Sequence, residues 1–343
     1  MKSNKNEVDQ KKAVSDLKQL IRGFQFSQAI HVAAVLRIAD HMSSELRASN
    51  DIAKEVGAHP PTLYRLLRAL AAIGVFREDD QRRFSLTAMG ACLRSDSRTP
   101  LGPRAVLIGQ AENWNTWGHL LHSIKTGENA FQSIHGEGIW THRERHPEKN
   151  DIFNAAMTSS SRRSNQAIVK AVDFDRFQCI ADIGGGQGSL LAAILSAYHK
   201  PHGVIFDQPH VIPSAWQVME AAGIGNRCEV HSGDMFEAVP SGCDAYILKN
   251  VLHDWDDTQC VQILQTCCRA MVPGAVIHVI ERLVGPPNED PDIKFSDLHM
   301  LVSPGGQKRT LEEFVSLFNK GGLRLTDTIK TESSHSIMIG ELL

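Results

Sequence analysis

The sequence lacks the features that mark membrane and secreted proteins. No apolar run approaches the length of about 18 residues that a transmembrane helix needs. The N-terminal stretch MKSNKNEVDQKK has no apolar core of the kind found in signal peptides. The seven cysteines form no C-x-x-C pair and are odd in number, so we expect reduced thiols and a cytoplasmic protein.

The chain also lacks an excess of basic residues. It carries 36 Lys and Arg against 39 Asp and Glu, a formal net charge of −3. Such a balance argues against a protein built mainly to hold nucleic acid. Hydrophobic residues make up 42% of the 343 positions, which is enough for packed cores, and the length predicts about two domains.

Residues 11–42 have the spacing of a helix with an unusually broad apolar face. A single surface helix needs a narrower apolar face, so the extra apolar width predicts burial of this face against a partner, such as a second subunit. The face consists of Leu17, Ile21, Phe24, Ala29, Val32, Val35 and Leu36.

Residues 48–93 read as a short helix, a turn, a longer helix and two short strands. This order is typical of a winged helix, a relative of the helix-turn-helix modules. Such a unit can bind DNA, or it can be reused for dimerisation. The helix that would enter DNA offers only Arg65 and Arg68 amid leucines, so we favour dimerisation.

Residues 100–170 are expected to be mostly helical and are rich in aromatic and histidine side chains, Trp114 among them. These side chains suit an ordinary core, and they equally suit the wall of a substrate pocket. Both interpretations stay open at this point.

Alternating strands and helices from residue 177 onward predict an α/β domain with a mostly parallel, doubly wound sheet. Ligands of such sheets bind at the carboxyl ends of the strands, near the point where the strand order reverses. The expected strands are Cys179–Ile183, Gly203–Phe206, Cys228–His231, Ala245–Leu248, Val276–Ile280, Leu323–Lys330 and Ser336–Gly340.

The first of these strands runs into a glycine loop, ADIGGGQGSLL, with glycines at 184, 186 and 188. Glycines allow the backbone to approach a ligand closely. The dinucleotide fingerprint would need a further glycine where Ser189 stands. Asp182 at the start of the loop disfavours a pyrophosphate and suits an ammonium group. The loop therefore favours S-adenosylmethionine over NAD.

Two further acids follow strand ends. Asp207 closes the second strand, where a carboxylate can accept both ribose hydroxyls, although an exposed turn residue is the alternative. Asp234 follows the third strand and can accept the adenine amino group, with Met235 or Phe236 against the ring. Acids at three successive strand ends form a coherent nucleoside site.

The motifs DIGGGQG, FDQP, GDMF, LKNVLHDWDD and SPGGQKRT occur in this order along the chain. Together they resemble the S-adenosylmethionine-dependent O-methyltransferases of the plant caffeate type and their bacterial relatives in antibiotic and phenazine biosynthesis. The resemblance covers nearly the whole chain and implies a homodimer with a small aromatic acceptor. It implies a winged-helix-like dimerisation domain over residues 1–98, a helical linker and pocket wall over 99–170, and a Rossmann-like catalytic domain over 171–343.

The resemblance also implies site residues, carried over by position. The implied cofactor set is Asp182, Gly184, Gly186, Asp207, Asp234, Met235, Lys249, Trp255 and Ser161, with Trp255 packing on the adenine. On the acceptor side it implies Met157, Asp297 and Met300, to which we add Trp114. No metal is expected.

His253, in LKNVLHDWDD, is interpreted as a general base. A phenol has a pKa of about 10 and is mostly protonated at neutral pH, and a histidine is matched to remove that proton. Glu281 ends the fifth expected strand, and if this strand neighbours the fourth, its carboxylate can fix the imidazole tautomer. The resemblance assigns the same two roles.

The acids around His253 have simpler interpretations. Asp256 with Gln259 has the spacing of a capping pair for the following helix. Asp254 could orient the cofactor, the histidine or nothing. Clustered carboxylates can hold a hard cation, but adjacent side chains need not converge and no second cluster supports a metal here.

Lys308 departs from the plant pattern, in which a second glutamate assists the histidine. We predict a catalytic role for it, either through its effect on His253 or by binding an anionic oxygen of the substrate. A side chain that points to solvent, as most lysines do, is the alternative. Lys308 also motivates an alternative function, a hydroxylase or pericyclase on the same scaffold that no longer transfers methyl groups. A winged-helix regulator that senses S-adenosylmethionine is a further alternative.

Overall fold

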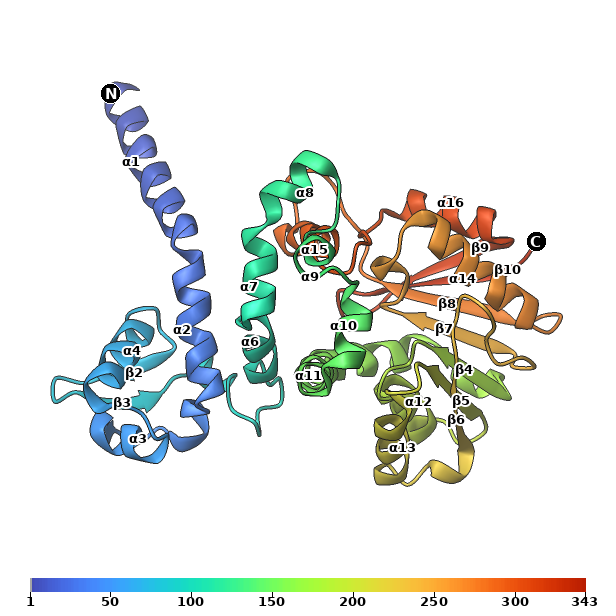
Figure 1. Ribbon diagram of the computed structural model, residues 1–343, viewed down its shortest axis with the longest axis horizontal. Helices are drawn as coiled ribbons and strands as arrows, with labels where there is room; N and C mark the ends of the chain where they lie inside the picture. Colours follow the sequence, from blue (N-terminus) through green and yellow to red (C-terminus); the bar gives the residue numbers. More distant parts are fainter. Residues whose placement is uncertain (1) are drawn as a thin grey trace. The chain divides into compact units, whose positions relative to one another are not determined.

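The computed structural model describes residues 2–343 (Figure 1). The chain divides into two compact units, one ending at Trp114 and the other beginning at Asn115. This boundary lies inside helix α7 (Ala111–Gly118). The three-part division expected from the sequence, with boundaries after residues 98 and 170, stays a prediction. Within the described residues, no helix combines the length and the apolar character needed to cross a bilayer.

The first unit is mostly helical, and its long N-terminal helix is broken where the sequence predicts continuity. The helical prediction over residues 11–42 is wrong beyond Val35, because Arg37 adopts a left-handed backbone with φ 52° and a single 3-10 turn follows. The elements are α1 (Lys2–Ile21), α2 (Gly23–Val35), η1 (Ile38–His41), β1 (Arg47–Ala48), α3 (Ser49–Glu55), α4 (Pro60–Ala72), β2 (Phe76–Glu78), β3 (Arg83–Leu86), α5 (Ala88–Ala91) and α6 (Gly102–Ile108).

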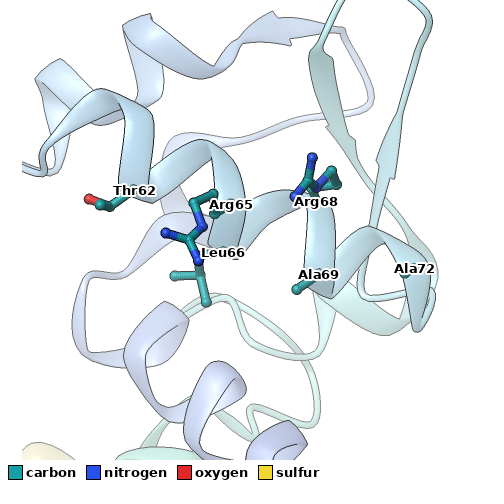
Figure 2. Close-up of a pocket in the computed structure, with 6 residues that line it drawn as sticks. All are labelled: Thr62, Arg65, Leu66, Arg68, Ala69 and Ala72. Atoms are coloured by element: carbon teal, nitrogen blue, oxygen red, sulfur yellow. The ribbon is translucent and has the colours of Figure 1, made fainter.

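The winged-helix pattern is present in this unit. α3 and α4 pack on a three-stranded antiparallel sheet of order β1-β3-β2. Leucines spaced along α4 bury one face of that helix, while Arg65 and Arg68 lie on another. Figure 2 shows the outer surface of α4, where Arg65 and Arg68 lie with Thr62 and Leu66 along an open hollow of about 530 Å³. The buried core is formed by Ile38, Ile52, Leu63, Leu67, Leu70, Phe76 and Phe84.

Large apolar side chains stay exposed along α1 and α2. Leu20 is 76% exposed and Phe24 is 57% exposed. The broad apolar face expected from the sequence is therefore real and is not covered within its own unit. Of the other expected members, Leu17, Ile21, Val32 and Val35 are also exposed, and Val14 and Leu20 extend the face beyond the expected residues.

The second unit is built on a seven-stranded sheet of order β6-β5-β4-β7-β8-β10-β9. The first five of these strands are parallel, and β10 runs antiparallel to both β8 and β9. The doubly wound prediction is confirmed, and the strand order reverses between β4 and β7. The strands are β4 (Cys179–Ile183), β5 (His202–Asp207), β6 (Cys228–Ser232), β7 (Ala245–Lys249), β8 (Val276–Glu281), β9 (Leu323–Lys330) and β10 (Ser336–Leu342).

Side chains alternate between the two faces of the sheet and create two cores. Ile180, Ile205 and Ile247 pack under α11, α12 and α13, whereas Tyr246 and Ile277 pack under α14 and α16. The helices of this unit are α8 (Leu120–Thr126), α9 (Ala130–His135), α10 (Ile139–Arg145), α11 (Pro147–Ala171), α12 (Ser189–Ala197), α13 (Ile212–Ala221), α14 (Asp257–Ala270), α15 (Pro291–Val302) and α16 (Leu311–Gly321), with 3-10 turns η2 (Phe174–Arg176), η3 (Gly225–Arg227) and η4 (Leu252–Asp254).

The expectation of seven reduced thiols is wrong for one pair. Cys179 at the start of β4 and Cys243 just before β7 form a disulfide, with Cα atoms 4.6 Å apart. The parallel pairing of these two strands brings the residues together, which the spacing of 64 residues in the sequence does not reveal. Three of the remaining thiols are deeply placed, and burial raises the pKa of Cys228, Cys260 and Cys267 to about 12.

Candidate active site

Asp182, Asp207, Lys249 and Glu281 lie at or next to the carboxyl ends of β4, β5, β7 and β8, and the strand order reverses between β4 and β7. The loop after β4 needs glycine at each expected position, since Gly184, Gly186 and Gly188 have φ values of 67°, 59° and 74°. A Cβ on Gly184 would lie 2.8 Å from Val251. A Cβ on Gly186 would meet no atom within 4 Å, so the loop is open to a ligand at that point.

Asp182 and Lys249 form the charged centre beneath this loop. Both are at the ends of neighbouring strands, β4 and β7. Burial raises the pKa of Asp182 to about 7, against the lowering effect of Lys249. Burial likewise lowers the pKa of Lys249 to about 8, against the raising effect of Asp182 and Glu281. Neither charge is fully compensated, and this is the environment in which a ligand charge binds well.

Asp207 at the end of β5 is tied to the glycine loop. One carboxylate oxygen accepts a hydrogen bond from the Gly186 amide at 2.8 Å, and the other accepts one from the Gln208 amide at 2.7 Å. Burial raises the pKa of Asp207 despite these two bonds. The carboxylate is thus fixed beside the loop, in the position from which the sequence predicts ribose binding.

Asp234, Met235 and Trp255 surround a further part of the site. Asp234 is exposed and accepts a hydrogen bond from the Phe236 amide at 2.9 Å. The Phe236 and Trp255 rings meet edge to face, with centroids 4.8 Å apart. Met235 is half-buried against the same core. The two aromatic side chains are suited to pack against an adenine ring, and the exposed carboxylate beside them is suited to accept a hydrogen bond from its amino group.

The donor set as a whole fits S-adenosylmethionine. A buried acid suits its ammonium, a fixed acid suits its ribose hydroxyls, and an exposed acid beside aromatic rings suits its adenine. The open space at Gly186 leaves room for the ligand backbone.

α11 covers the glycine loop and contributes residues that sequence reasoning missed. The buried amide of Asn165 accepts a hydrogen bond from Lys249 Nζ at 2.8 Å and donates one to Ser189 Oγ at 3.1 Å. Thr158 donates to Gln187 in the loop at 2.7 Å. No motif marks Asn165; only its burial on a helix that packs on α12 reveals its position. Met157 and Ser161 lie half-buried on the same helix, and their expected ligand contacts stay predictions.

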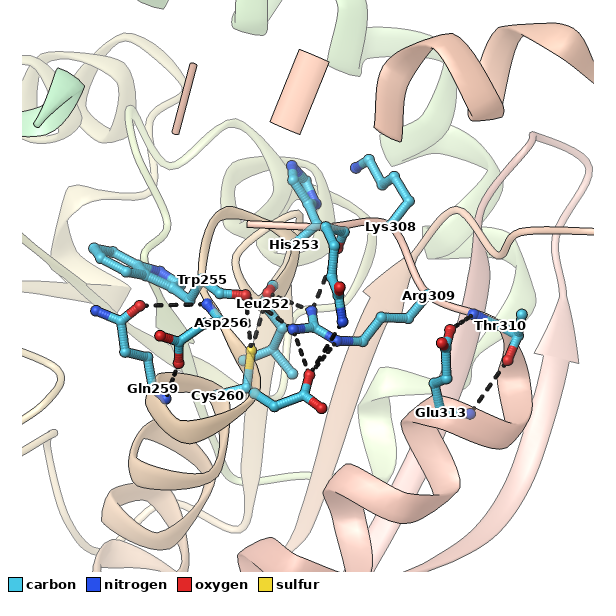
Figure 3. A network of polar contacts seen from close by, with 12 residues as sticks. Leu252, His253, Trp255, Asp256, Gln259, Cys260, Lys308, Arg309, Thr310 and Glu313 are labelled. Carbon is cyan, nitrogen blue, oxygen red and sulfur yellow. Dashed lines mark hydrogen bonds and ion pairs between the residues drawn. The ribbon is translucent and has the colours of Figure 1, made fainter. Parts of the chain in front are cut away.

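His253 (Figure 3) lies in η4, which follows β7, and Glu281 is the last residue of β8. The expected contact between them is present, with His253 Nδ1 at 2.7 Å and 2.9 Å from the two carboxylate oxygens. The Glu281 side chain is fully buried. Burial alone would raise the pKa of Glu281, but the charges of His253 and Lys308 lower it to about 2. The carboxylate is therefore ionised at neutral pH.

Lys308 and Asp254 complete a buried cluster of charges. Lys308 Nζ is 3.8 Å from Glu281 Oε2, and Asp254 Oδ1 is 3.5 Å from His253 Nε2. Burial lowers the pKa of Lys308 against the effect of Glu281. Burial raises the pKa of Asp254 against the effects of His253 and Lys308. Figure 3 shows the side chains of His253 and Lys308 extending to the same side of the chain.

Arg309, which sequence reasoning did not single out, holds the His253 segment in place. Its fully buried guanidinium donates to the carbonyls of Leu252 and Trp255, both at 2.9 Å (Figure 3), and to Asp257 at 2.8 Å. Gly306 packs against the same backbone, so closely that a Cβ would lie 2.2 Å from the His253 carbonyl. The PGGQKRT motif therefore acts largely by fixing the loop that carries His253.

The remaining acceptor-side predictions are spread more widely. Asp297 on α15 accepts a hydrogen bond from the Lys308 amide at 2.7 Å, and Met300 is buried on the same helix. Trp114 belongs to the first unit, where its ring lies 6.5 Å from that of Phe24. The structure brings Asp297 next to Lys308, and the substrate roles of Asp297, Met300 and Trp114 stay predictions.

The acids that follow His253 have separate structural tasks. Asp256 and Gln259 form the expected capping box at the start of α14. Asp257 pairs with Arg309. The carboxylates of Asp256 and Asp257 therefore point to different partners and do not form one cluster.

Comparison with known proteins covers both units. A family profile described as an O-methyltransferase domain matches residues 117–324, and one described as an O-methyltransferase dimerisation domain matches residues 18–96. The chain is 40% identical over 325 residues to phenazine O-methyltransferase PhzM of Lysobacter antibioticus, across 94% of this chain and 95% of that one. It is 36% identical over 318 residues to mitomycin biosynthesis 6-O-methyltransferase of Streptomyces lavendulae, across 91% and 90% of the two chains.

Comparison with solved structures also finds similarity to an O-methyltransferase. The chain resembles NcsB1, an O-methyltransferase from neocarzinostatin biosynthesis in complex with S-adenosylmethionine and 2-hydroxy-5-methyl naphthoic acid. The TM-score is 0.82 at 32% identity, across 93% of this chain and 96% of that one.

Proposed function

Because the chain belongs to the S-adenosylmethionine-dependent O-methyltransferases of natural-product biosynthesis, we propose that it methylates a phenolic or similarly acidic hydroxyl of a small aromatic metabolite, with His253 as general base. The observation that carries the proposal is the 2.7 Å contact between His253 Nδ1 and the buried Glu281 carboxylate. This pair lies at the same edge of the sheet as the cofactor residues.

S-adenosylmethionine is the cofactor of this family. When bound, it supplies an activated methyl group, which leaves alignment and deprotonation of the acceptor to the protein. Asp182 would hold its ammonium, Asp207 its ribose hydroxyls and Asp234 its adenine amino group. Lys249 and Asn165 would keep the Asp182 carboxylate and the glycine loop in position.

His253 performs the proton transfer in this proposal. The Glu281 carboxylate accepts a hydrogen bond from Nδ1, which leaves the lone pair of Nε2 to take the proton of the acceptor hydroxyl. Glu281, ionised because its pKa is about 2, then stabilises the imidazolium. Asp254, 3.5 Å from Nε2, lies next to the proton that His253 gains.

Lys308 is proposed to stabilise the acceptor oxygen as its proton leaves. Its ammonium is buried beside Glu281 and extends to the same side as the imidazole (Figure 3). A buried cation favours the anionic form of a nearby oxygen. The same position would let Lys308 polarise a carbonyl, and this observation favours the second candidate, a pericyclase or hydroxylase that retains the cofactor fold.

The named relatives guide the choice of acceptor. One is a phenazine O-methyltransferase, and one neighbouring structure holds 2-hydroxy-5-methyl naphthoic acid. Both names support a flat, fused aromatic acceptor that carries a hydroxyl. A homodimer is also proposed, since the dimerisation domain includes the exposed apolar face of α2.

Transfer of an isotopically labelled methyl group tests the proposal. The full chain is incubated with methyl-labelled S-adenosylmethionine and a panel of hydroxyphenazines, hydroxynaphthoates, flavonoids and phenolic polyketides. We expect label in an O-methyl product of at least one acceptor. Conversion of an acceptor into an unlabelled product would overturn methyl transfer and favour the second candidate.

A further inference from the structure

Three side chains of the types that bind metal ions lie close together around α10, outside the proposed active site. Among the residues that the structure describes, one carboxylate oxygen of Glu137 and one ring nitrogen each of His142 and His146 lie within 4.8 Å of one another. His142 is 6% exposed, and His146 is four residues further along the chain. Histidines four residues apart in a helical stretch present their rings on the same face, and here the ring centroids are 4.3 Å apart.

We propose that Glu137, His142 and His146 bind a divalent transition-metal ion of the zinc type. Two imidazoles and one carboxylate are a ligand set that Zn²⁺ takes in proteins, with water in the fourth position. Ligand atoms around a tetrahedral zinc lie roughly 3.3 Å apart, given bonds of about 2.0–2.1 Å. The cluster therefore needs a contraction of about an ångström or somewhat more, within reach of side-chain rotation. This site departs from the expectation of no metal.

In the absence of an ion, neighbouring cations satisfy the same ligands. His142 Nδ1 is 2.9 Å from one oxygen of Glu137, and Arg145 pairs with the other oxygen at 2.7 Å. Lys149 Nζ is 3.0 Å from His142 Nε2. A metal on Nδ1 would leave Nε2 protonated, so the Lys149 ammonium would have to withdraw. Lys149 and the metal are therefore competitors for His142.

The position of the cluster indicates what the ion would do. Glu137 precedes α10, His142 lies within it, and His146 is the residue at the joint with α11. The ion would fix this joint. α10 also carries Arg143, whose guanidinium lies 3.5 Å from the Phe153 ring centroid and whose charge partly opposes the rise in the pKa of Asp254 that burial causes. The ion is structural, and its binding does not depend on the proposed methyl transfer.

Zinc titration of the metal-stripped full chain tests the site, with a chromophoric chelator as competitor and Co²⁺ absorption as a second readout. We expect one Zn²⁺ per chain, with affinity reduced roughly a hundredfold in His146→Gln and in Glu137→Gln, at the upper end of the loss that an outer-shell partner causes. Lys149→Met is expected to bind Zn²⁺ several-fold more tightly. Since binding displaces a proton, affinity should also fall as the pH is lowered.

His122→Gln is the matched control, because His122 pairs with Glu128 at 3.0 Å without forming part of the three-residue group. It should bind Zn²⁺ like the native chain. Two results would overturn the site: no zinc bound by the native chain at micromolar concentrations, or equal affinity in the native chain, His146→Gln and Glu137→Gln. Circular dichroism of each variant separates loss of the site from loss of the fold.

Discussion

The two halves of the proposed active site, the cofactor half around Asp182 and Lys249 and the acceptor half around His253 and Glu281, differ in how their charges are compensated. In the cofactor half, burial shifts the pKa of Asp182 up to about 7 and that of Lys249 down to about 8, so each charge is short of compensation. In the acceptor half, His253 and Lys308 lower the pKa of Glu281 to about 2. Asp182 is thus expected to gain its missing countercharge from the ligand, whereas the charge of Glu281 is compensated by His253 and Lys308, although burial still lowers the pKa of Lys308 and raises that of Asp254 beside it.

This difference has a physical consequence for each half. Uncompensated charges cost stability in the free protein and add to ligand affinity when the ligand supplies the missing charge. Internally paired charges hold a base in one tautomer and orientation, which benefits the rate of proton transfer more than binding. Substitutions in the cofactor half should therefore mainly lower the affinity for the cofactor. Substitutions in the acceptor half should mainly lower kcat.

Apart from removal of His253 itself, the largest effect is expected from Glu281→Gln in the acceptor half. The amide cannot stabilise the imidazolium and no longer favours a single tautomer of His253, so kcat should fall by roughly a thousandfold. Affinity for S-adenosylhomocysteine should stay within about threefold of native, because Glu281 is not among the cofactor acids. Steady-state kinetics with calorimetric titration of the product give both values. A large loss of affinity with unchanged kcat would assign Glu281 to the other half.

Arg309→Met should destabilise the acceptor half without removing a reacting group. The change leaves the carbonyls of Leu252 and Trp255 without their buried donor, at a cost of about 3 kcal/mol in the free energy of unfolding. Arg324→Met is the control, since Arg324 is exposed and its 3.4 Å pair with Glu341 should contribute under about 0.5 kcal/mol. Urea unfolding measures both, and equal losses in the two variants would refute the role of Arg309.

Because the charge of Asp182 in the cofactor half is not fully compensated, the affinity for S-adenosylhomocysteine should depend on pH. Asp182 must be ionised to hold an ammonium, and with a pKa of about 7 its ionised fraction falls about tenfold between pH 8 and pH 6. Affinity for S-adenosylhomocysteine should fall by the same factor on acidification, as measured by titration calorimetry. In Asp182→Asn the affinity should be weak and independent of pH over this range.

Asp182→Asn should weaken ligand binding but stabilise the ligand-free protein. The pKa of Asp182 is higher in the folded chain than the ordinary value of 3.8, so the folded state loses stability as the pH rises from about 4 to 7. The amide that replaces this carboxyl cannot ionise, and Asp182→Asn should therefore raise the Tm of the free protein at pH 8. A lower Tm together with unchanged affinity would show that Asp182 is compensated within the chain.

The smallest effect is expected from substitution of Asp256, the N-cap residue of α14. Asp256→Ala removes a capping box and should cost about 1 kcal/mol of stability. Activity per folded molecule should be unchanged, in contrast to every substitution at His253 or Glu281. Thermal unfolding with an active-site titration separates the two quantities, and a loss of kcat would extend the catalytic group to Asp256.

The two halves also differ in how far the sequence predicts them. The cofactor half lies at successive strand ends, so the β–α rhythm and the glycine loop place Asp182 and Asp207 without knowledge of packing. In the acceptor half, the sequence predicts the contact of His253 with Glu281, because the two follow neighbouring strands. Arg309 was missed, since its bonds go to backbone carbonyls more than 50 residues away, and no side-chain pattern records them.

Long-range packing explains the other errors. The disulfide between Cys179 and Cys243 depends on the pairing of β4 with β7, which spacing alone does not give. Asn165 is recognisable only once α11 is seen to cover the glycine loop. The break of the N-terminal helix at Arg37 is a local backbone event that the apolar periodicity of residues 11–42 does not register.

The most direct test compares the native chain with His253→Ala in a single turnover of methyl-labelled S-adenosylmethionine, using an acceptor found in the panel, while product affinity is measured on the same samples. The account predicts a loss of about a thousandfold or more in the rate of methyl transfer, with S-adenosylhomocysteine affinity within about threefold of native. A native rate of transfer in His253→Ala would contradict it, because alignment of the two substrates would then suffice without a base.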